Sequence, residues 1–411
     1  MKSSNQIYYS LKSPKIFRIF ADVSARPVRA NSLNSMKKSI FCAALTFFAL
    51  TVLTSFTVDR SSEIRYALYG VAFYNTENLF DTLHDEGKND FEYLPDGINK
   101  WGKMKYEAKL SNIARVLSEL CTDKLPAGPA VIGLSEVENE TVLQDLLKQP
   151  ALASRGWQYV TYPGLDRRGI ECAFLYNPKF FELDSSMIVN YYYAPSGKVD
   201  DPLVGFYTDA DGRVRAYPEL KGDTTYITRG FLVMEGKLAD EKFFFIVNHW
   251  PSRGASSEAR ERAAFQVNAL KNALMKQDPA AKVVIMGDLN DDPNNKSVVE
   301  QLGCKSDAKK VKHSTDLYNP WYNMLYKVGQ GTLMYNGKWN LFDQIILSGN
   351  LVGDDRSDLK FYKNEIFIRD YLFQQEGRYK GNPLRTHAGG AWLNGYSDHL
   401  PTYVYLIKEL K

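Results

Sequence analysis

The sequence is poor in cysteine and histidine, with four and five residues respectively in a chain of 411. It contains no Cys-x-x-Cys and no His-Glu-x-x-His pattern, so the usual structural and protease zinc sites have no support. Cys121, Cys172 and Cys304 stand far apart beyond the first sixty residues, and their odd number leaves at least one free thiol. We therefore expect a fold that does not depend on disulfides.

Internal repeats and linkers rich in Pro, Gly or Ser are also absent from the sequence. Hydrophobic residues make up 44% of the chain and charged residues 24%, a composition that is ordinary for a globular protein and excludes a disordered or fibrous one. We expect two parts, a targeting segment over residues 1–60 and a single domain over residues 61–411.

One long uncharged run occurs near the N-terminus, at Ser39–Val58, and it follows Lys37 and Lys38. A positive segment, an apolar run and a small-x-small site such as Ser55–Thr57 are typical of a secretory signal peptide. Residues before Met36 fit no part of a compact signal peptide, so we expect either that translation starts at Met36 or that the positive segment is unusually long. We predict a secreted or periplasmic protein. The alternative is an uncleaved membrane anchor, because a run of this length can span a bilayer.

The net charge of +3 belongs to this leader. Residues 1–60 carry nine Lys or Arg and two Asp, so the remainder has a formal charge of −4. The expected mature domain therefore lacks the overall positive field that gathers nucleic acid without sequence preference.

Four apolar segments run directly into a residue that can bind metal or move a proton. They are "YGVAFYN" ending at Asn75, "AVIGLSE" at Glu136, "KFFFIVNH" at His249 and "KVVIMGD" at Asp288, with Asn290 two residues further on. Each apolar run predicts a buried strand. Turn formation and capping are the alternative roles for any one Asp or Asn after a strand, but repetition at four strand ends favours a site.

Two further segments show the reverse order, with Asp343 opening "DQIILS" and Asp398–His399 preceding "PTYVYL". In a sheet whose neighbouring strands run in opposite directions, the ends of one set and the beginnings of the other share an edge. We therefore expect all of these side chains to meet at one rim.

Two long segments have the periodicity of amphipathic helices. One is "WGKMKYEAKLSNIARVLSELC", which begins at Trp101, and the other is "SSEARERAAFQVNALKNALMK", for which Ser257 is the expected N-cap. Both are predicted to pack against the sheets rather than to carry chemistry.

The ordered motifs "NTENLF", "LSEVEN", "VNHWPSR", "GDLND", "FDQIILS" and "YSDHLP" resemble those of the endonuclease/exonuclease/phosphatase superfamily, over about residues 70–406. Each motif is weak alone, but six in order are specific. The resemblance implies an α/β fold, a four-layer αββα sandwich. Two mostly antiparallel sheets pack face to face in it, with helices outside.

The same resemblance implies a divalent cation with Glu136 as its principal ligand and Asn75 and Asp398 nearby. Hard oxygen donors without a thiolate suit Mg²⁺ or Mn²⁺. The resemblance also assigns the catalytic side chains. Asp288 positions or deprotonates the attacking water, and Asn290 orients that water.

Two histidines complete the implied catalytic set. His399, held in one tautomer by Asp343, faces the phosphoryl oxygens together with His249. A role for His249 as a structural interior histidine is the alternative, because buried His side chains commonly find a structural partner.

Three arginines are candidates for substrate binding, Arg385, Arg253 and Arg229. Arginine suits both bidentate phosphate binding and surface solvation. Arg385 is favoured for substrate contact because it lies in the long segment that leads to Asp398 and His399.

The residues and the resemblance together predict a secreted, divalent-metal-dependent hydrolase of phosphoric esters, and the resemblance favours a nuclease-type phosphodiesterase. A phosphatase, or a phosphodiesterase acting on phospholipids or inositol phosphates, is the alternative at the same site. A catalytically silent binding protein is less favoured, because all eight motif residues are chemically competent. A phosphoester is the expected partner, nucleic acid among the candidates, and a monomer without a stable protein partner is expected.

Overall fold

The computed structural model describes residues 64–191, 204–218 and 228–410. The expected targeting segment, residues 1–60, lies outside this described part. Residues 67–408 belong to one compact unit. Among the described helices, none combines the length and the apolar character needed to cross a membrane.

Two large sheets form the body of this unit. The six-stranded first sheet has the order β16 (Lys360–Ile366), β19 (Thr402–Leu410), β1 (Arg65–Leu79), β2 (Val131–Val137), β4 (Glu171–Tyr176) and β3 (Gln158–Thr161). The β1–β2 pair is parallel, whereas the β2–β4, β3–β4 and β16–β19 pairs are antiparallel.

The seven-stranded second sheet has the order β11 (Cys304–Lys305), β12 (Leu317–Tyr318), β15 (Asp343–Ser348), β10 (Lys282–Asp288), β9 (Glu241–His249), β8 (Phe231–Leu238) and β5 (Phe181–Val189). Its β9–β10 and β11–β12 pairs are parallel, and its other four pairs are antiparallel. The predicted mostly antiparallel sheets are therefore confirmed.

The remaining elements are short hairpins and helices. Three two-stranded sheets are β6 (Phe206–Thr208) with β7 (Val214–Ala216), β13 (Leu333–Tyr335) with β14 (Lys338–Asn340), and β17 (His387–Ala388) with β18 (Ala391–Trp392). The α-helices are α2 (Lys103–Glu119), α3 (Glu140–Leu147) and α4 (Ser257–Gln277). Single turns of 3₁₀ helix are η1 (Phe91–Tyr93), η2 (Ala153–Arg155), η4 (Ala308–Lys310), η6 (Gly349–Leu351) and η7 (Asp370–Leu372), and π-helical turns are η3 (Ser297–Gln301) and η5 (Met324–Val328).

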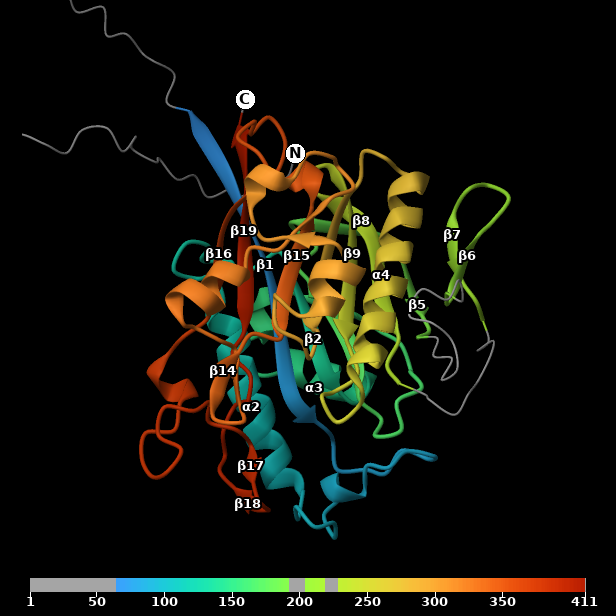
Figure 1. Cartoon of the computed structure of the whole chain (residues 1–411). Helices are drawn as coiled ribbons and strands as arrows, with labels where there is room; N and C mark the ends of the chain where they lie inside the picture. Colours follow the sequence, from blue (N-terminus) through green and yellow to red (C-terminus); the bar gives the residue numbers. More distant parts are fainter. Residues whose placement is uncertain (1–63, 192–203, 219–227, 411) are drawn as a thin grey trace, which may run out of the picture. The chain divides into compact units, whose positions relative to one another are not determined.

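Successive side chains of β10 point to opposite faces of the second sheet, and this alternation shows the layers of the fold. Val284 and Met286 belong to the apolar core that joins both sheets with α2 and α3, whereas Val283 and Ile285 pack with the apolar face of α4. Figure 1 shows α4 alongside β8 and β9. A strand covered on both faces is expected to be apolar at every position, which explains the run "VVIM". The layer order helix, sheet, sheet, helix is the predicted αββα sandwich.

Both predicted packing helices form. The face of α2 that carries Leu110, Ile113 and Leu117 is buried, as its spacing predicted. The predicted N-cap of α4 is wrong by one residue: Ser257 is the first helical residue and Ser256 occupies the cap, without a capping hydrogen bond from its side chain. Sequence could not separate two adjacent serines that have the same capping chemistry.

Gly287 of β10 pairs with Asn248 of β9, immediately before Asp288. A Cβ at this position would lie 2.2 Å from the Asn248 carbonyl oxygen, which is backbone and cannot turn away. We expect Gly287→Ala to lower the free energy of unfolding by roughly 1–3 kcal/mol, the usual cost of overpacking. Urea denaturation measures this change. The control is Gly254→Ala, whose Cβ would meet only Ser252 Oγ at 3.4 Å, and equal stabilities of the two variants would contradict the steric account.

Candidate active site

Three candidate residues lie side by side on neighbouring strands of the second sheet. In register, Asp288 at the end of β10 pairs with His249 at the end of parallel β9 and with Asp343 at the start of antiparallel β15. Paired residues on adjacent strands place their side chains on the same face of the sheet. The strand directions therefore produce the row that the sequence predicted.

The first sheet contributes Asn75 and Glu136 from its parallel strands β1 and β2. The register between these strands shifts after the Asn75–Ser135 pair, and Glu136 has a left-handed backbone with φ 62°. A bulge of this kind turns a side chain to a new direction. Glu136 Oε2 accepts the Asn78 backbone N–H at 2.9 Å, and its Oε1 accepts Asn75 Nδ2 at 3.4 Å. The Glu136 carboxylate is thus fixed at the rim.

Asn75 joins the two sheets at the site. Its Nδ2 donates to Asp288 Oδ2 at 3.0 Å, and its carbonyl oxygen accepts Ser397 Oγ at 2.8 Å. Ser397 Oγ also accepts the His399 backbone N–H at 3.0 Å. Asn75 therefore holds the second sheet and the segment 397–399 in one place.

His399 and Asp343 form a buried pair. His399 Nδ1 lies 2.8 Å from Asp343 Oδ2, and Asp343 has no exposed surface. Burial disfavours the charged imidazole, but the Asp343 carboxylate outweighs it, followed by Asp288, so the pKa of His399 is raised well above its usual value. His399 Nε2 lies 3.9 Å from Asp288 Oδ2. A cationic imidazole therefore faces the centre of the site.

Asp288 is a buried carboxylate with an unusual proton affinity. Burial raises its pKa to about 7, and the carboxylates of Asp343 and Glu136 add to the rise. The charge of His399 and the Asn290 backbone N–H, which donates to Asp288 Oδ1 at 2.9 Å, oppose it. A carboxylate that titrates near neutral pH is well suited to exchange protons with water.

His249 has the opposite character to His399. Its Nε2 lies 3.7 Å from Glu136 Oε1 and 3.6 Å from Asp288 Oδ2, yet burial, with the charges of Arg229 and Arg168, lowers its pKa well below the usual value. His249 is therefore a neutral imidazole, whose Nδ1 has no hydrogen-bond partner among the described residues.

Asn290 lies in the same site but is more constrained than the resemblance implied. Its Nδ2 donates to the Trp250 carbonyl oxygen at 3.0 Å, and its backbone is left-handed with φ 51°. The side-chain carbonyl of Asn290 and the second N–H of its amide are left to contact a water.

Arg229 and Arg253 are occupied inside the protein. Arg229 is buried, pairs with Asp166 at 2.9 Å and donates to the Trp250 carbonyl oxygen at 3.1 Å. Arg253 pairs with Asp292 at 3.1 Å, donates to the Asn290 carbonyl oxygen at 3.1 Å, and lies over the ring of Phe342. Arg229 supports the chain just after His249, and Arg253 supports the loop that carries Asn290. The predicted contact of these two arginines with substrate therefore gains no support from this geometry.

Arg385, the favoured substrate contact, lies at the mouth of the site. Its side chain is 43% exposed, its Nε donates to Glu77 Oε1 at 3.0 Å, and its Nη2 lies 3.0 Å from Asp398 Oδ2. Asp398 Oδ1 in turn lies 3.9 Å from His399 Nε2. Arg385 and Asp398 therefore border the site together.

Two sets of side chains could hold a cation here. Asp288, Asp343 and His399 offer three ligand atoms within 4.8 Å of one another, and Asp343 Oδ1 is a buried acceptor without a hydrogen-bond partner among the described residues. The resemblance pointed instead to Asn75, Glu136 and Asp398. The Asp343–His399 hydrogen bond accounts for much of the first set's closeness, because it already joins two of its three members.

Sequence reasoning missed three charged residues at or behind the site: Glu77, Lys109 and Arg168. Glu77 lies within the motif "NTENLF", which could have indicated it. Lys109 is buried on a helix and Arg168 stands in the loop between β3 and β4, and no pattern in the sequence connects either of them to the motifs.

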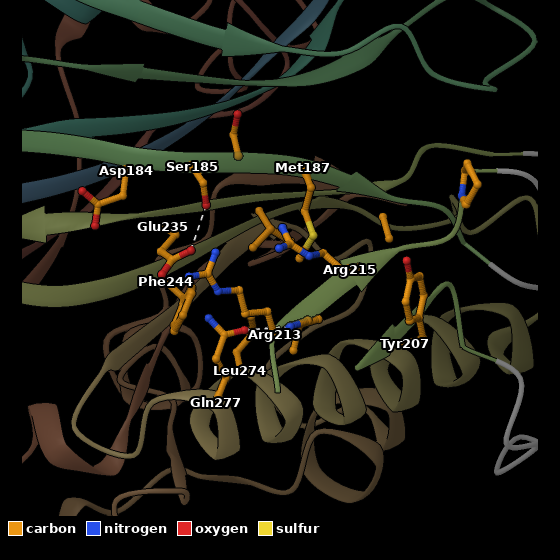
Figure 2. Close-up of a pocket in the computed structure, with 15 residues that line it drawn as sticks. Asp184, Ser185, Met187, Tyr207, Arg213, Arg215, Glu235, Phe244, Leu274 and Gln277 are labelled. Carbon is orange, nitrogen blue, oxygen red and sulfur yellow. Dashed lines mark hydrogen bonds between the residues drawn. The ribbon is translucent and has the colours of Figure 1, made fainter. Parts of the chain in front are cut away.

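A cavity of about 670 Å³ opens elsewhere, among β5, β8, the end of α4 and the β6–β7 hairpin. Figure 2 shows its lining side chains, including Met187, Arg215 and Phe244. None of the predicted site residues lines it, so the cavity is separate from the row at the strand ends.

Comparison with solved structures shows the same fold at low sequence identity. ANGEL2, a 2′,3′-cyclic phosphatase, has a TM-score of 0.51 at 14% identity, covering 84% of this chain and 96% of its own. A mannosyl-6-phosphatase of Bacteroides thetaiotaomicron has a TM-score of 0.46 at 17% identity, covering 82% and 99%. TDP2 of D. rerio, complexed with a single-strand DNA product, has a TM-score of 0.46 at 14% identity, covering 82% and 98%.

Comparison with curated proteins gives no significant match in sequence. The family model for the endonuclease/exonuclease/phosphatase family matches residues 70–204 and 210–408, which includes all six motifs. The chain therefore belongs to the endonuclease/exonuclease/phosphatase family of hydrolases.

Proposed function

We propose that this protein is a divalent-metal-dependent hydrolase of phosphoric esters, with Asp288 as the general base. One observation carries the proposal: a buried carboxylate whose pKa is about 7 lies 3.9 Å from an imidazole that Asp343 keeps charged. Phosphoryl transfer needs a base for water on one side and positive donors at the phosphoryl oxygens. Asp288 and His399 supply these two functions.

The donor set at the rim fits a hard cation such as Mg²⁺ or Mn²⁺. Glu136 would be the principal ligand, with Asn75 and Asp398 nearby, because Asp343 is committed to His399 whereas the Glu136 carboxylate is accessible at the rim. Oxygen donors without thiolate suit these ions. When bound, the cation would neutralise charge on the phosphoryl oxygens and position them.

The chain's own residues then account for the chemical step. Asp288 accepts a proton from water as the water oxygen forms a bond to phosphorus. The ester P–O bond breaks, and the leaving oxygen takes up a proton from solvent water. His399 donates its Nε2–H to a phosphoryl oxygen, where negative charge concentrates, and the side-chain carbonyl of Asn290 is available to orient the water.

Two substrate classes fit this mechanism. The family resemblance favours internal phosphodiesters of the nuclease type. Phosphomonoesters are the second class, because Arg168 and Arg385 offer guanidinium donors that could bind a terminal phosphate. The decisive experiment is a turnover panel with Mg²⁺ or Mn²⁺ on DNA, RNA, inositol phosphates and sphingomyelin. A protein that turns over none of these and no simple phosphate ester would be a silent binding protein on the same scaffold.

We also infer that the enzyme is exported, because the run Ser39–Val58 after two lysines is typical of a signal peptide. Mass spectrometry of the protein recovered from the periplasm or medium tests this inference. A mature N-terminus close to residue 58 is the expected result, whereas an intact chain in the membrane fraction would favour the anchor.

The metal assignment predicts that Glu136→Gln loses the rise in melting temperature caused by Mg²⁺ or Mn²⁺, together with most turnover. A cation that binds only the native state stabilises it by mass action, and an amide is a weaker ligand than a carboxylate. Thermal denaturation with and without the cation measures the effect. If Glu136→Gln keeps both the metal-dependent rise and turnover, Glu136 is not the ligand.

The matched control is Glu138→Gln, two residues further along the chain, just after the end of β2. Burial raises the pKa of Glu138 to about 9, so this side chain is already uncharged at neutral pH and glutamine resembles it closely. The metal-dependent rise should persist in this variant.

A further inference from the structure

Glu77 and Asn78, at the end of β1, are consecutive residues with left-handed backbones, at φ 49° and 54°. Such a conformation is costly for residues other than glycine and persists where surrounding contacts impose it, often at functional sites. The Asn78 backbone N–H holds Glu136 Oε2 at 2.9 Å. The two side chains of this turn are also engaged, and each holds an arginine.

Glu77 holds Arg385. The buried Glu77 carboxylate accepts Arg385 Nε at 3.0 Å through Oε1 and the Thr386 backbone N–H at 2.8 Å through Oε2. Arg385 Nη2 is bound to Asp398. Two nitrogens of the guanidinium are therefore fixed, and Nη1 has no hydrogen-bond partner among the described residues, so it remains available to a ligand.

Lys109 of α2 binds the segment that follows Arg385. It is buried, and its Nζ donates to Thr386 Oγ1 at 2.5 Å and to the Tyr396 carbonyl oxygen at 2.6 Å. Glu77 and Lys109 thus both hold Thr386, the residue after Arg385, which limits the entropy that Arg385 would lose on binding a ligand.

Asn78 holds Arg168. Asn78 Oδ1 accepts Arg168 Nη1 at 3.1 Å, and Arg168 is exposed in the loop between β3 and β4. The other nitrogens of its guanidinium have no partner within the described part of the chain. Asn78 also donates its backbone N–H to Glu136. Arg168 and the proposed cation ligand Glu136 are therefore bound to the same residue.

We propose that Arg168 and Arg385 form a phosphate-binding pair that selects substrates with a terminal phosphate group. This inference rests on the proposed function. A phosphodiester offers two non-bridging oxygens, which His399 and a cation can already serve. A terminal phosphate adds a third oxygen and a second negative charge, and two arginines with free donors match that addition.

The test compares a monoester with a diester that share one leaving group, 4-nitrophenyl phosphate and bis(4-nitrophenyl) phosphate, in the presence of Mg²⁺ or Mn²⁺. Arg168→Gln and Arg385→Gln should each lower kcat/KM for the monoester by on the order of 10- to 100-fold, as expected for a charge-assisted hydrogen bond. The loss for the diester should be at least about tenfold smaller. Equal losses on both substrates would overturn the selectivity, with the hydrolase proposal left standing.

The matched control is Arg167→Gln. Arg167 is the exposed neighbour of Arg168, and within the described ranges its side chain makes no hydrogen bond or ion pair with a site residue. Both kcat/KM values should stay at the wild-type level. If Arg167→Gln reproduces the loss of Arg168→Gln, the effect comes from the general charge of the loop and the pair does not exist.

Glu77→Gln tests the positioning of Arg385 separately, because glutamine keeps the shape but removes the charge behind the guanidinium. For the monoester, KM should rise while kcat changes little. A fall in kcat with unchanged KM would contradict a positioning role through Arg385.

A binding measurement separates failure of this inference from failure of the proposed function. Calorimetric titration of the wild type and of both arginine variants with phenyl phosphate and diphenyl phosphate requires no turnover. The wild type should bind phenyl phosphate more tightly, and each arginine variant should lose that preference. If turnover is absent but the preference is present, the hydrolase proposal fails and the arginine pair stands; no preference in the wild type overturns the pair.

Discussion

Asp288→Asn is expected to lower kcat by at least about 10², the lower end of the effect of a positioned general base. Asparagine can still accept the Asn290 backbone N–H that now reaches Asp288 Oδ1 at 2.9 Å, so the loop keeps its anchor. It cannot accept a proton from water. Single-turnover kinetics at saturating cation measures the chemical step, and the metal-dependent rise in melting temperature should remain largely intact.

Asp291→Asn is the control for this prediction, because Asp291 lies in the same loop but has a structural role. It is buried, pairs with Arg260 at 2.8 Å and accepts Ser297 Oγ at 2.7 Å. Its loss should reduce the free energy of unfolding, since a buried charge then lacks its partner, while kcat is retained. Unchanged turnover in Asp288→Asn would remove Asp288 from the mechanism.

The rim of the fold was predictable because strand periodicity and strand direction together determine where side chains meet. "KVVIMGD" and "KFFFIVNH" had to be buried strands, and their parallel pairing places His249 beside Asp288. Asp343 joins them because β15 runs the other way. The convergence of these three residues therefore follows from local patterns plus one rule about sheet edges.

The arginines were less predictable, because the role of a guanidinium depends on partners far away in sequence. Arg229 is neutralised by Asp166, which lies 63 residues earlier in the chain, and Arg385 is held by Glu77, which lies 308 residues earlier. Nothing in the local sequence distinguishes the buried structural arginine from the half-exposed one. Arg168 escaped notice for the same reason.

Backbone geometry was also beyond the reach of pattern reasoning. Glu77, Asn78, Glu136 and Asn290 all have positive φ, although none is glycine. These conformations are imposed by tertiary hydrogen bonds such as the one from the Asn78 N–H to Glu136. A residue type gives only a propensity for a backbone conformation, and here the hydrogen bonds of the site override the preference for negative φ.

The Asp343–His399 pair leads to the second prediction with a large effect, which is that the two side chains act as one unit. His399 Nδ1 is 2.8 Å from Asp343 Oδ2, and this carboxylate keeps the imidazole oriented and charged toward the phosphoryl oxygens. Asp343→Asn and His399→Gln should each lower kcat by on the order of 10²–10⁴, as for other positioned proton-bearing groups.

In the double variant Asp343→Asn/His399→Gln, the second change should add little, because residues that act as a unit show strongly non-additive losses. If Asp343 only stabilises the start of β15, its replacement would instead cost stability, and the two losses in kcat would multiply. Rate constants for the wild type, both single variants and the double variant at saturating cation separate these cases, with urea denaturation of each protein to remove the contribution of unfolding. Multiplicative losses among folded proteins would exclude the pair, because a carboxylate that orients and charges an imidazole has nothing left to act on once that imidazole is gone.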